Sequence, residues 1–182
     1  MKNIIEAMEA NRNEMQEWFE HMHRNPELSM QEDQTARYLA DLVSKWGYEV
    51  ETGVGKHGVV ASLTNGNSGK AIGLRADFDA LPIQEDNSLP YKSSVEGVSH
   101  LCGHDGHSTM LLAAGKYLAD TKNFKGTVRL IFQPGEETME GGPAMIQDGL
   151  FERFPVDAVY GMHNMPGLEL GKFYFADGDV MA

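Results

Sequence analysis

Stretches with the periodicity of β-strands alternate along this chain with longer stretches that have the periodicity of helices. The expected helices cover residues 1–24, 33–46, 107–118 and 143–148, and the expected strands cover residues 48–51, 59–63, 71–75, 127–132 and 158–161. Such alternation is typical of an α/β fold, here a layered α/β/α sheet with helices on both faces. Because functional groups in such sheets collect on the loops that follow the strands, we look for candidate site residues there.

Three local signals add detail to this expected sheet. Asn65-Gly66 lies between the second and third expected strands and is typical of a β-hairpin turn. The helix at 33–46 is expected to end at Gly47, which has the residue type of a C-terminal cap. The run at 158–161 is interpreted as a buried strand.

The size and composition of the chain limit its class. With 182 residues, of which 41% are hydrophobic and 23% charged, the chain has enough material for one packed core and falls in the globular range. No apolar stretch approaches the roughly 18 residues that a membrane span needs. Acidic residues interrupt the N-terminus before a secretory signal could form. We therefore expect a single domain located in the cytoplasm.

Charge and cysteine content restrict the expected partners. The chain has 27 acidic and 15 basic residues, a net charge of -12, and no basic stripe, so neither nucleic acid nor an anionic membrane is expected as a partner. Its one cysteine, Cys102, cannot form an intramolecular disulfide. A lone thiol of this kind indicates a reduced intracellular protein, in which the thiol is reactive or bound to a metal.

Two carboxylates follow the expected strand at 71–75. Asp77 and Asp79 are two residues apart, so in extended backbone both side chains project to the same side. This arrangement would suit a cation. A turn built on aspartate side chains and closed by Pro82 explains the same residues equally well.

The densest group of chemically active residues is Cys102-Gly103-His104-Asp105-Gly106-His107. Cysteine, histidine and carboxylates bind zinc and similar divalent ions, and the glycines allow these side chains to approach one point. Taken alone, the cluster is more often structural, with a cysteine that packs as a small apolar residue and histidines that cap the next helix. In that interpretation His107 is a residue of the first helical turn and no more.

Two more groups of ligand-type residues follow expected strands. Glu136 and Glu137 are adjacent, so their side chains diverge, and one can bind a metal while the other reaches a water molecule. His163 offers a neutral imidazole, a common ligand of divalent ions. A solvated acidic loop and a structural histidine are the simpler explanations. Because four segments present ligand-type residues at the same edge of the sheet, the metal-site interpretation is favoured.

Five segments are spread in order over nearly the whole chain: HRNPELSMQE at 23–32, LRADFDALPI at 74–83, HLCGHDGHSTMLLAA at 100–114, FQPGEE at 132–137 and GMHNMPG at 161–167. Together they resemble the amidohydrolase branch of the aminoacylase and carboxypeptidase metallopeptidases, which includes hippurate hydrolases and plant auxin-conjugate hydrolases. The resemblance implies a zinc-peptidase-like α/β sheet. It also implies metal-dependent hydrolysis of the amide bond of N-acyl amino acids, which makes a small molecule the expected partner.

The resemblance further implies a site with two divalent ions, of zinc, manganese, nickel or cobalt. The implied metal ligands are Cys102, which bridges both ions, His104 and His163 on one ion, and Glu137 on the other. Glu136 resembles the general base of the family, which takes a proton from water and returns it to the leaving amine. Asp79 resembles the carboxylate that supports the ligands.

Chains of this family are about twice as long as this one. They continue through a lid and dimerisation domain and return to the catalytic domain, where one more histidine ligand lies. The resemblance therefore implies that residues 1–182 are the N-terminal part of the catalytic domain, and that the lid and the C-terminal part are absent from this chain. The full-length protein is expected to be a homo-oligomer. The 182-residue chain alone is expected to self-associate or to be marginally stable, and to be nearly inactive.

Two other functions stay open at this point. A cysteine hydrolase would use Cys102 as nucleophile and His104 or His107 as base, but it leaves the two glutamates and His163 without a role. A non-catalytic domain would bind a metal or a partner, with its truncated edge as the interface. Chelation separates the first alternative from a metal hydrolase, because a cysteine nucleophile survives EDTA. Turnover by the 182-residue chain separates the second.

Overall fold

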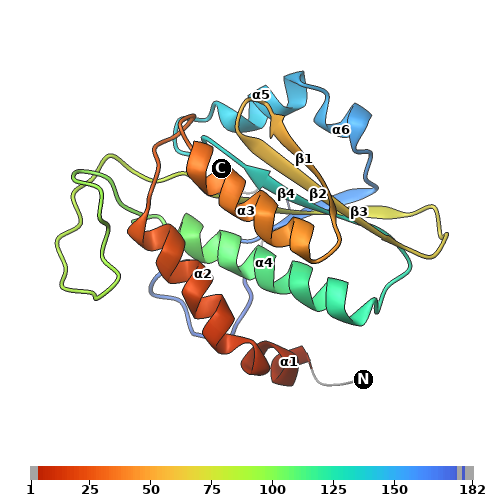
Figure 1. Ribbon diagram of the computed structural model, residues 1–182, viewed down its shortest axis with the longest axis horizontal. Coiled ribbons are helices and arrows are strands. Elements are labelled where there is room, and N and C mark those ends of the chain that lie inside the picture. Colours follow the sequence, from red (N-terminus) through yellow and green to blue (C-terminus); the bar gives the residue numbers. More distant parts are fainter. Residues whose placement is uncertain (1–3, 176–177, 179–182) are drawn as a thin grey trace.

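The computed structural model describes residues 4–175 and 178, and its elements are labelled in Figure 1. The helices are α1 (Ile4–Ala10), α2 (Arg12–Arg24), α3 (Asp33–Lys45), α4 (His104–Thr121), α5 (Gly141–Gln147) and α6 (Leu150–Arg153), and the strands are β1 (Glu49–Val54), β2 (Gly58–Asn65), β3 (Ala71–Asp77), β4 (Gly126–Gln133) and β5 (Ala158–Gly161). Among the described helices, none has the length and apolar character that crossing a membrane requires. Residues 179–182, near which the lid domain is expected to begin, lie outside the described residues.

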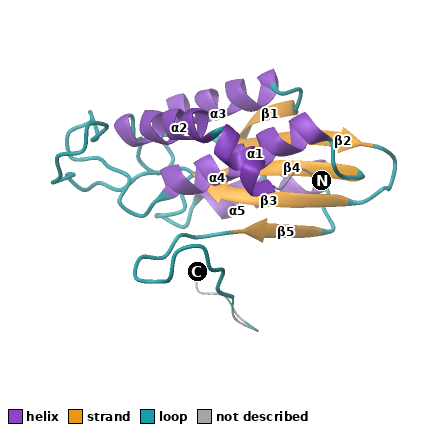
Figure 2. Cartoon of the chain, turned by 90° about the horizontal axis from the view of Figure 1, so that it is seen from below, coloured by secondary structure: helices purple, strands orange, loops and turns teal. Residues whose placement is uncertain are grey.

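The five strands form one mixed sheet in the order β1-β2-β4-β3-β5. β2 pairs antiparallel with both β1 and β4, whereas β3 pairs parallel with both β4 and β5. Figure 2 shows the strands side by side, with β5 at one edge. Because β3, β4 and β5 run in the same direction, their carboxyl ends lie at the same edge of the sheet, where Asp77 is opposite Gln133.

Successive residues of the central strands face two different cores, as the pleat of a strand requires. Val59 and Ala61 of β2 belong to the larger core, which packs the sheet against α2, α3 and α4. Val60, between them, belongs to a smaller core with Met145 of α5 and Leu150 of α6. Figure 1 shows α3 and α4 on one side of the sheet and α5 and α6 on the other. The predicted layered α/β fold with helices on both faces is therefore confirmed.

The strand order corrects the predicted hairpin at Asn65-Gly66. β2 and β3 do not pair with each other, because β4 lies between them and pairs with both. The hairpin of this sheet is formed by β1 and β2, with its turn at residues 55–57. The Asn65 side chain serves another contact, because its amide donates to the backbone carbonyls of Lys122 and Phe124 in the loop before β4.

β5 has the predicted bounds, but the prediction that it is buried was wrong. Among the described residues it pairs only with β3. Its side chains are correspondingly open, with Val159 43% and Tyr160 60% exposed. A strand at the edge of a sheet has one neighbour, so its other side is free to pair or to meet solvent.

Several helix boundaries also differ from expectation, and two of the differences are explained by local residues. The predicted helix at 1–24 is divided at Asn11 into α1 and α2, and residues 1–3 lie outside the described residues. Asparagine favours the ends of helices over their interiors, because its side chain competes for backbone hydrogen bonds. α4 begins at His104, three residues earlier than expected, directly after Gly103 with its φ of +92°. This boundary places His104 in the first turn of the helix.

Candidate metal centre

The residues with predicted chemistry lie together at the carboxyl ends of β3, β4 and β5, beside the first turn of α4. Three groups of side chains there have ligand-type atoms within 4.8 Å of one another. These groups are Cys102 with His104 and His163, Asp77 with His104 and His107, and His104 with Glu136 and Glu137. His104 belongs to all three groups, so this one imidazole is the centre of the arrangement.

His104 is fully buried, and Asp79 holds one of its ring nitrogens. The distance from His104 Nδ1 to Asp79 Oδ1 is 3.1 Å. The other oxygen of Asp79 accepts hydrogen bonds from the Ser29 hydroxyl at 2.7 Å and from the Glu137 backbone N–H at 3.0 Å. Burial raises the pKa of Asp79, but these hydrogen bonds outweigh it and the pKa lies below its usual value. Since an ionised carboxylate only accepts, the neutral imidazole carries its proton on Nδ1 and presents a lone pair at Nε2.

The second nitrogen of His104 faces the two glutamates that follow β4. Its Nε2 lies 3.7 Å from Glu136 Oε2 and 3.7 Å from Glu137 Oε1, which is too far for a hydrogen bond. His104 Nε2 and Glu137 Oε1 are both buried without a hydrogen-bond partner among the described residues. Buried polar atoms without partners are uncommon in proteins. Imidazole nitrogens and carboxylate oxygens are both ligands of divalent cations, so the two atoms suit metal ions bound beside them.

The charge around His104 also favours a cation. Burial lowers the pKa of the imidazole, but the carboxylates of Asp79, Asp77 and Glu137 outweigh it and raise the pKa above its usual value. The site therefore stabilises positive charge at this point, whether a proton or a metal ion supplies it.

Cys102 and His163 face His104 from a second direction. The distance from Cys102 Sγ to His163 Nε2 is 3.5 Å. Burial raises the pKa of the Cys102 thiol to about 11, and the carboxylates of Glu137 and Glu136 add to the shift. Without a cation beside it this thiol is protonated at neutral pH, which argues against Cys102 as a free thiolate nucleophile.

Both ring nitrogens of His107 have hydrogen-bond partners, whereas His104 Nε2 has none among the described residues. His107 Nδ1 lies 2.6 Å from Asp77 Oδ1, and its Nε2 lies 2.8 Å from Asn164 Oδ1. Asp77 also accepts a hydrogen bond from Arg75 at 2.8 Å. Burial raises the pKa of Asp77, but the hydrogen bond from His107 and the neighbouring positive charges outweigh it and lower the pKa to about 2. His107 and Asp77 therefore link β3 to segment 162–167.

Gly103 is the point at which this segment touches the start of α4. A Cβ atom at Gly103 would lie 2.3 Å from the side-chain nitrogen of Asn164, and the φ of +92° is one that other residues rarely adopt. Only glycine therefore lets the backbone between Cys102 and His104 approach Asn164 this closely.

Several residues that hold the site were not given a role from the sequence. Asn164 and Ser29 are two of them, and a buried network around His23 is another. His23 Nδ1 lies 2.6 Å from Asp105 Oδ2 and its Nε2 lies 3.0 Å from Glu85 Oε1, which ties the first turn of α4 to α2. The resemblance over 23–32 was the available signal for His23 and Ser29, whereas no sequence pattern marks Glu85.

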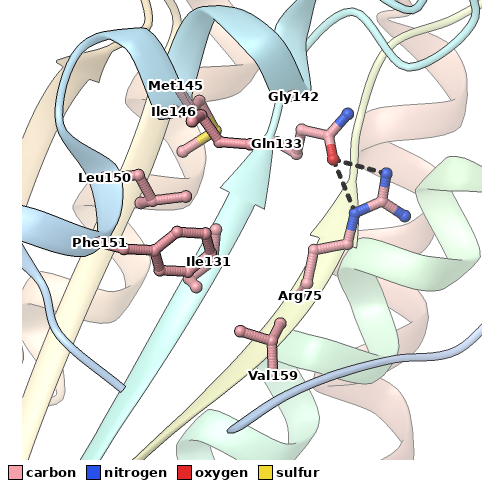
Figure 3. A pocket seen from close by; sticks show the side chains of 9 residues that line it. All are labelled: Arg75, Ile131, Gln133, Gly142, Met145, Ile146, Leu150, Phe151 and Val159. Atoms are coloured by element: carbon pink, nitrogen blue, oxygen red, sulfur yellow. Dashed lines mark hydrogen bonds between the residues drawn. The ribbon is translucent and has the colours of Figure 1, made fainter. Parts of the chain in front are cut away.

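A hollow of about 170 Å³ lies on the other face of the sheet, between the strands and α5 and α6. It is lined by Arg75, Ile131, Gln133, Gly142, Met145, Ile146, Leu150, Phe151 and Val159 (Figure 3). Its lining is mainly apolar, and Arg75 at one end is hydrogen-bonded to Gln133 at 2.8 and 3.0 Å. No cysteine, histidine or carboxylate side chain is among the described residues that line the hollow, so the candidate functional site stays at the strand ends.

Known protein sequences match this chain over most of its length. A sequence model of the peptidase family M20/M25/M40 matches residues 73–178. Hippurate hydrolase of Campylobacter jejuni subsp. jejuni is 55% identical over 161 residues, which are 88% of this chain and 42% of that protein. N-acyl-L-amino acid amidohydrolase of Geobacillus stearothermophilus is 39% identical over 91% of this chain and 45% of that protein. The chain therefore spans less than half the length of these curated relatives.

Solved structures match it as well. A dinuclear metal-binding peptidase of the M20 family from Bacillus subtilis has a TM-score of 0.82 and 36% identity, over 88% of this chain and 45% of that chain. An aminobenzoyl-glutamate utilization protein from Klebsiella pneumoniae has a TM-score of 0.69 and 25% identity, over 88% of this chain and 45% of that one.

Proposed function

The chain belongs to the peptidase family M20/M25/M40, and on that premise we propose that the protein hydrolyses the amide bond of N-acyl amino acids at a centre of two divalent metal ions. Curated relatives named hippurate hydrolase, N-acyl-L-amino acid amidohydrolase and N-acetyl-L-cysteine deacetylase support this substrate class. Because the chain spans less than half of such relatives, the proposal concerns the complete protein.

In this proposal residues 1–182 form the N-terminal part of the metallopeptidase catalytic domain. The complete protein adds a lid and dimerisation domain and the C-terminal part of the catalytic domain, which supplies one more histidine ligand. The open edge of β5 and the exposed apolar side chains around it support an additional covering of this part of the sheet.

One observation carries the proposal. His104 Nε2 and Glu137 Oε1 are buried, face each other at 3.7 Å and have no hydrogen-bond partner among the described residues. Around them lie a thiol, a second imidazole and a second carboxylate. Cysteine, histidine and carboxylate are the ligands of zinc and related ions, so this donor set supports a centre of such ions beside the two atoms.

The metal ligands in this proposal are Cys102, which serves both ions, His104 and His163, which serve one, and Glu137, which serves the other. When bound, the ions supply Lewis-acid polarisation of the amide carbonyl and lower the pKa of water. Asp79 keeps the proton of the neutral His104 ring on Nδ1, so that Nε2 faces the site.

Glu136 is the proposed general base. Its side chain is 36% exposed and its Oε2 lies 3.7 Å from His104 Nε2, so the carboxylate is next to the ligands and open to water. It takes a proton from the water molecule that attacks the amide carbonyl. The same proton then passes to the leaving amine nitrogen, which releases an acid and an amine and restores the carboxylate.

Metal content and turnover of the full-length protein test the proposal. The wild type should retain divalent ions after reconstitution and dialysis, and a Cys102→Ala/His104→Ala double variant should not, as measured by elemental analysis. Hydrolysis of hippurate or of N-acetyl amino acids should stop in EDTA and return on addition of zinc or manganese. Equal metal content in the two proteins, or full activity in EDTA, would refute the proposed function.

A further inference from the structure

Segment 29–32, between α2 and α3, lies against two loops that carry candidate site residues. Just before it, Leu28 forms a β-bridge with Ala80, and the Ala80 N–H donates to the Glu27 carbonyl at 2.8 Å. The chain therefore runs alongside the residues that follow β3. The proposed function gives this segment no role, although two of its polar side chains, Ser29 and Glu32, each bind one of the two loops.

Ser29 binds the loop after β3. Its hydroxyl donates to Asp79 Oδ2 at 2.7 Å, and the same oxygen accepts the Glu137 backbone N–H at 3.0 Å. Oδ1 is left for His104 Nδ1 at 3.1 Å. The Ser29 hydroxyl therefore helps to set the rotation of the Asp79 carboxylate between the imidazole and the glutamate loop.

Glu32 is fully buried at the N-cap position of α3, yet its side chain does not cap this helix. Glu27 accepts the first amides of α3 instead, from Gln34 at 3.1 Å and Thr35 at 2.7 Å. Glu32 Oε1 accepts the Gly135 backbone N–H at 2.7 Å, and Oε2 has no partner among the described residues. Because a buried carboxylate is unfavourable unless it is hydrogen-bonded, the bond to the loop after β4 is what this residue contributes.

Gly135 is the point at which that loop is fixed. It has a φ of +53°, and a Cβ atom there would lie 2.7 Å from Met30 Sδ, so the loop packs directly against segment 29–32. The Gly135 carbonyl accepts two backbone N–H groups at the start of α5, at 3.2 and 3.1 Å. With its N–H bonded to Glu32 and its carbonyl bonded to α5, Gly135 has little freedom, and Glu136 follows it directly.

We propose that segment 29–32 positions the carboxylates of the metal centre. Glu32 fixes, through Gly135, the loop that carries the two glutamates, and Ser29 fixes the aspartate that faces His104. The inference rests on the proposed function for what those carboxylates do. In it Ser29 and Glu32 touch neither substrate nor metal and act only as positioning residues.

Three variants of the full-length protein separate positioning from stability. Glu32→Leu removes the acceptor for the Gly135 N–H but keeps a similar volume. Glu32→Gln keeps a carbonyl oxygen for that bond, and burial already raises the pKa of Glu32 toward its neutral form. Glu27→Leu is the matched control, because it removes a carboxylate that caps α3 and makes no hydrogen bond to the loop.

Two measurements are made on each variant. Calorimetric titration of the metal-free protein gives the zinc dissociation constant, and hydrogen–deuterium exchange without metal gives the mobility of residues 134–141. Glu32→Leu should bind zinc roughly 10–100-fold more weakly, the usual effect of removing a residue that orients a ligand, and its loop should exchange faster. Glu32→Gln should stay close to the wild type. Glu27→Leu should lower the melting temperature and leave zinc binding and loop exchange unchanged.

The outcomes separate the inference from the function on which it rests. Zinc binding and loop exchange that are unchanged in Glu32→Leu, or changed equally in Glu27→Leu, would overturn the inference alone. A wild-type protein that binds no zinc above the Cys102→Ala/His104→Ala variant would overturn the proposed function and this inference with it.

Discussion

The candidate metal centre has a buried side and an exposed side, and different parts of the fold hold them. On the buried side, His104 and Asp79 are enclosed by β3, α4 and segment 29–32, with hydrogen bonds to the carboxylate from three directions. On the exposed side, His163 belongs to segment 162–167, which is exposed throughout and follows the edge strand β5. This segment contacts the rest of the site through two side-chain pairs: His163 lies beside the Cys102 thiol, and Asn164 is hydrogen-bonded to His107.

This difference shows what fixes a ligand in a layered sheet. A side chain at the start of a helix packed on central strands is positioned by the core itself. A side chain that follows an edge strand depends on local contacts and, in our proposal, on the part of the complete protein that covers this strand. We therefore expect substitutions on the buried side to have larger effects on metal binding than substitutions on the exposed side.

The largest difference is expected between the two histidines. His104→Asn should weaken zinc binding by more than roughly 100-fold, because all three candidate ligand groups lose their shared member, and His163→Asn by roughly 10-fold. Competition with a chromogenic chelator measures both constants, and circular dichroism of the metal-free variants controls for folding. Equal losses would show that the exposed side is held as firmly as the buried side.

The adjacent glutamates extend the comparison to two neighbouring residues. Glu137 has a buried oxygen with no hydrogen-bond partner in the described part of the chain, whereas the side chain of Glu136 is 36% exposed. Glu136→Gln should keep the metal and lose about 10²–10⁴-fold in kcat, the scale for removal of a general base, while Glu137→Gln should lose the metal as well. Elemental analysis and steady-state kinetics on an N-acyl amino acid distinguish them. Metal loss in Glu136→Gln with retention in Glu137→Gln would reverse the two roles.

A substitution at Gly103 should break the contact between the buried side and segment 162–167, because a Cβ atom there would clash with Asn164. Gly103→Ala should lower the free energy of unfolding by about 2–4 kcal/mol, from the left-handed backbone and the loss of the hydrogen bond between Asn164 and His107. Gly106→Ala is the matched control, because its Cβ would meet Asn164 only at 3.9 Å and alanine favours the helix. Denaturant titration measures both variants. A Gly103→Ala protein as stable as Gly106→Ala would show that the sides are not in contact.

The smallest effect concerns the His23 network behind the buried side. The hydrogen bond to Asp105 raises the pKa of His23 to about 9, with Glu85 adding to the shift and burial opposing it. Because the folded-state pKa is raised, protonated His23 stabilises the fold below about pH 6.5, and this contribution is lost as the pH rises toward 9. The unfolding free energy of the wild type should fall by about 1–3 kcal/mol more than that of His23→Gln across this range. If the unfolding free energies of the two proteins changed equally with pH, the raised pKa of His23 would be contradicted.

The local part of the fold could be predicted from the sequence, and the order of the strands could not. Periodicity gave α3, β4 and β5 nearly their observed bounds, because it reflects which face of each element is apolar. Asn65-Gly66 indicated a hairpin because a turn signal describes only its own few residues. The pairing of β2 with β4 joins residues that are from 61 (Asn65 with Gly126) to 73 (Val59 with Phe132) positions apart, and no local pattern indicates it.

The candidate site shows the same limit. Cys102, His104, the two glutamates and His163 could be singled out because each has a ligand-type side chain at the end of an expected strand or the start of an expected helix, and the parallel strands bring them to one edge. Their roles as ligands and base stay predictions. Glu32 and Glu85 could not be given a supporting role, because they bind Gly135 and His23 from far away in the sequence, and an isolated glutamate usually lies on the surface.

The strand order also has a consequence for the protein while it is being synthesised. β4 pairs with β2 and β3, and both of these leave the ribosome before it does. Translation covers the 56 residues from Asp77 to Gln133 in roughly 3–11 s at an elongation rate of about 5–20 residues per second. Throughout that interval the edges of β2 and β3 with which β4 later pairs stay open, and other chains can bind to them. The arrival of β4 closes these two edges and brings the loop of Glu136 and Glu137 beside the end of β3, whereas β5 and His163 join the sheet and the candidate site only later.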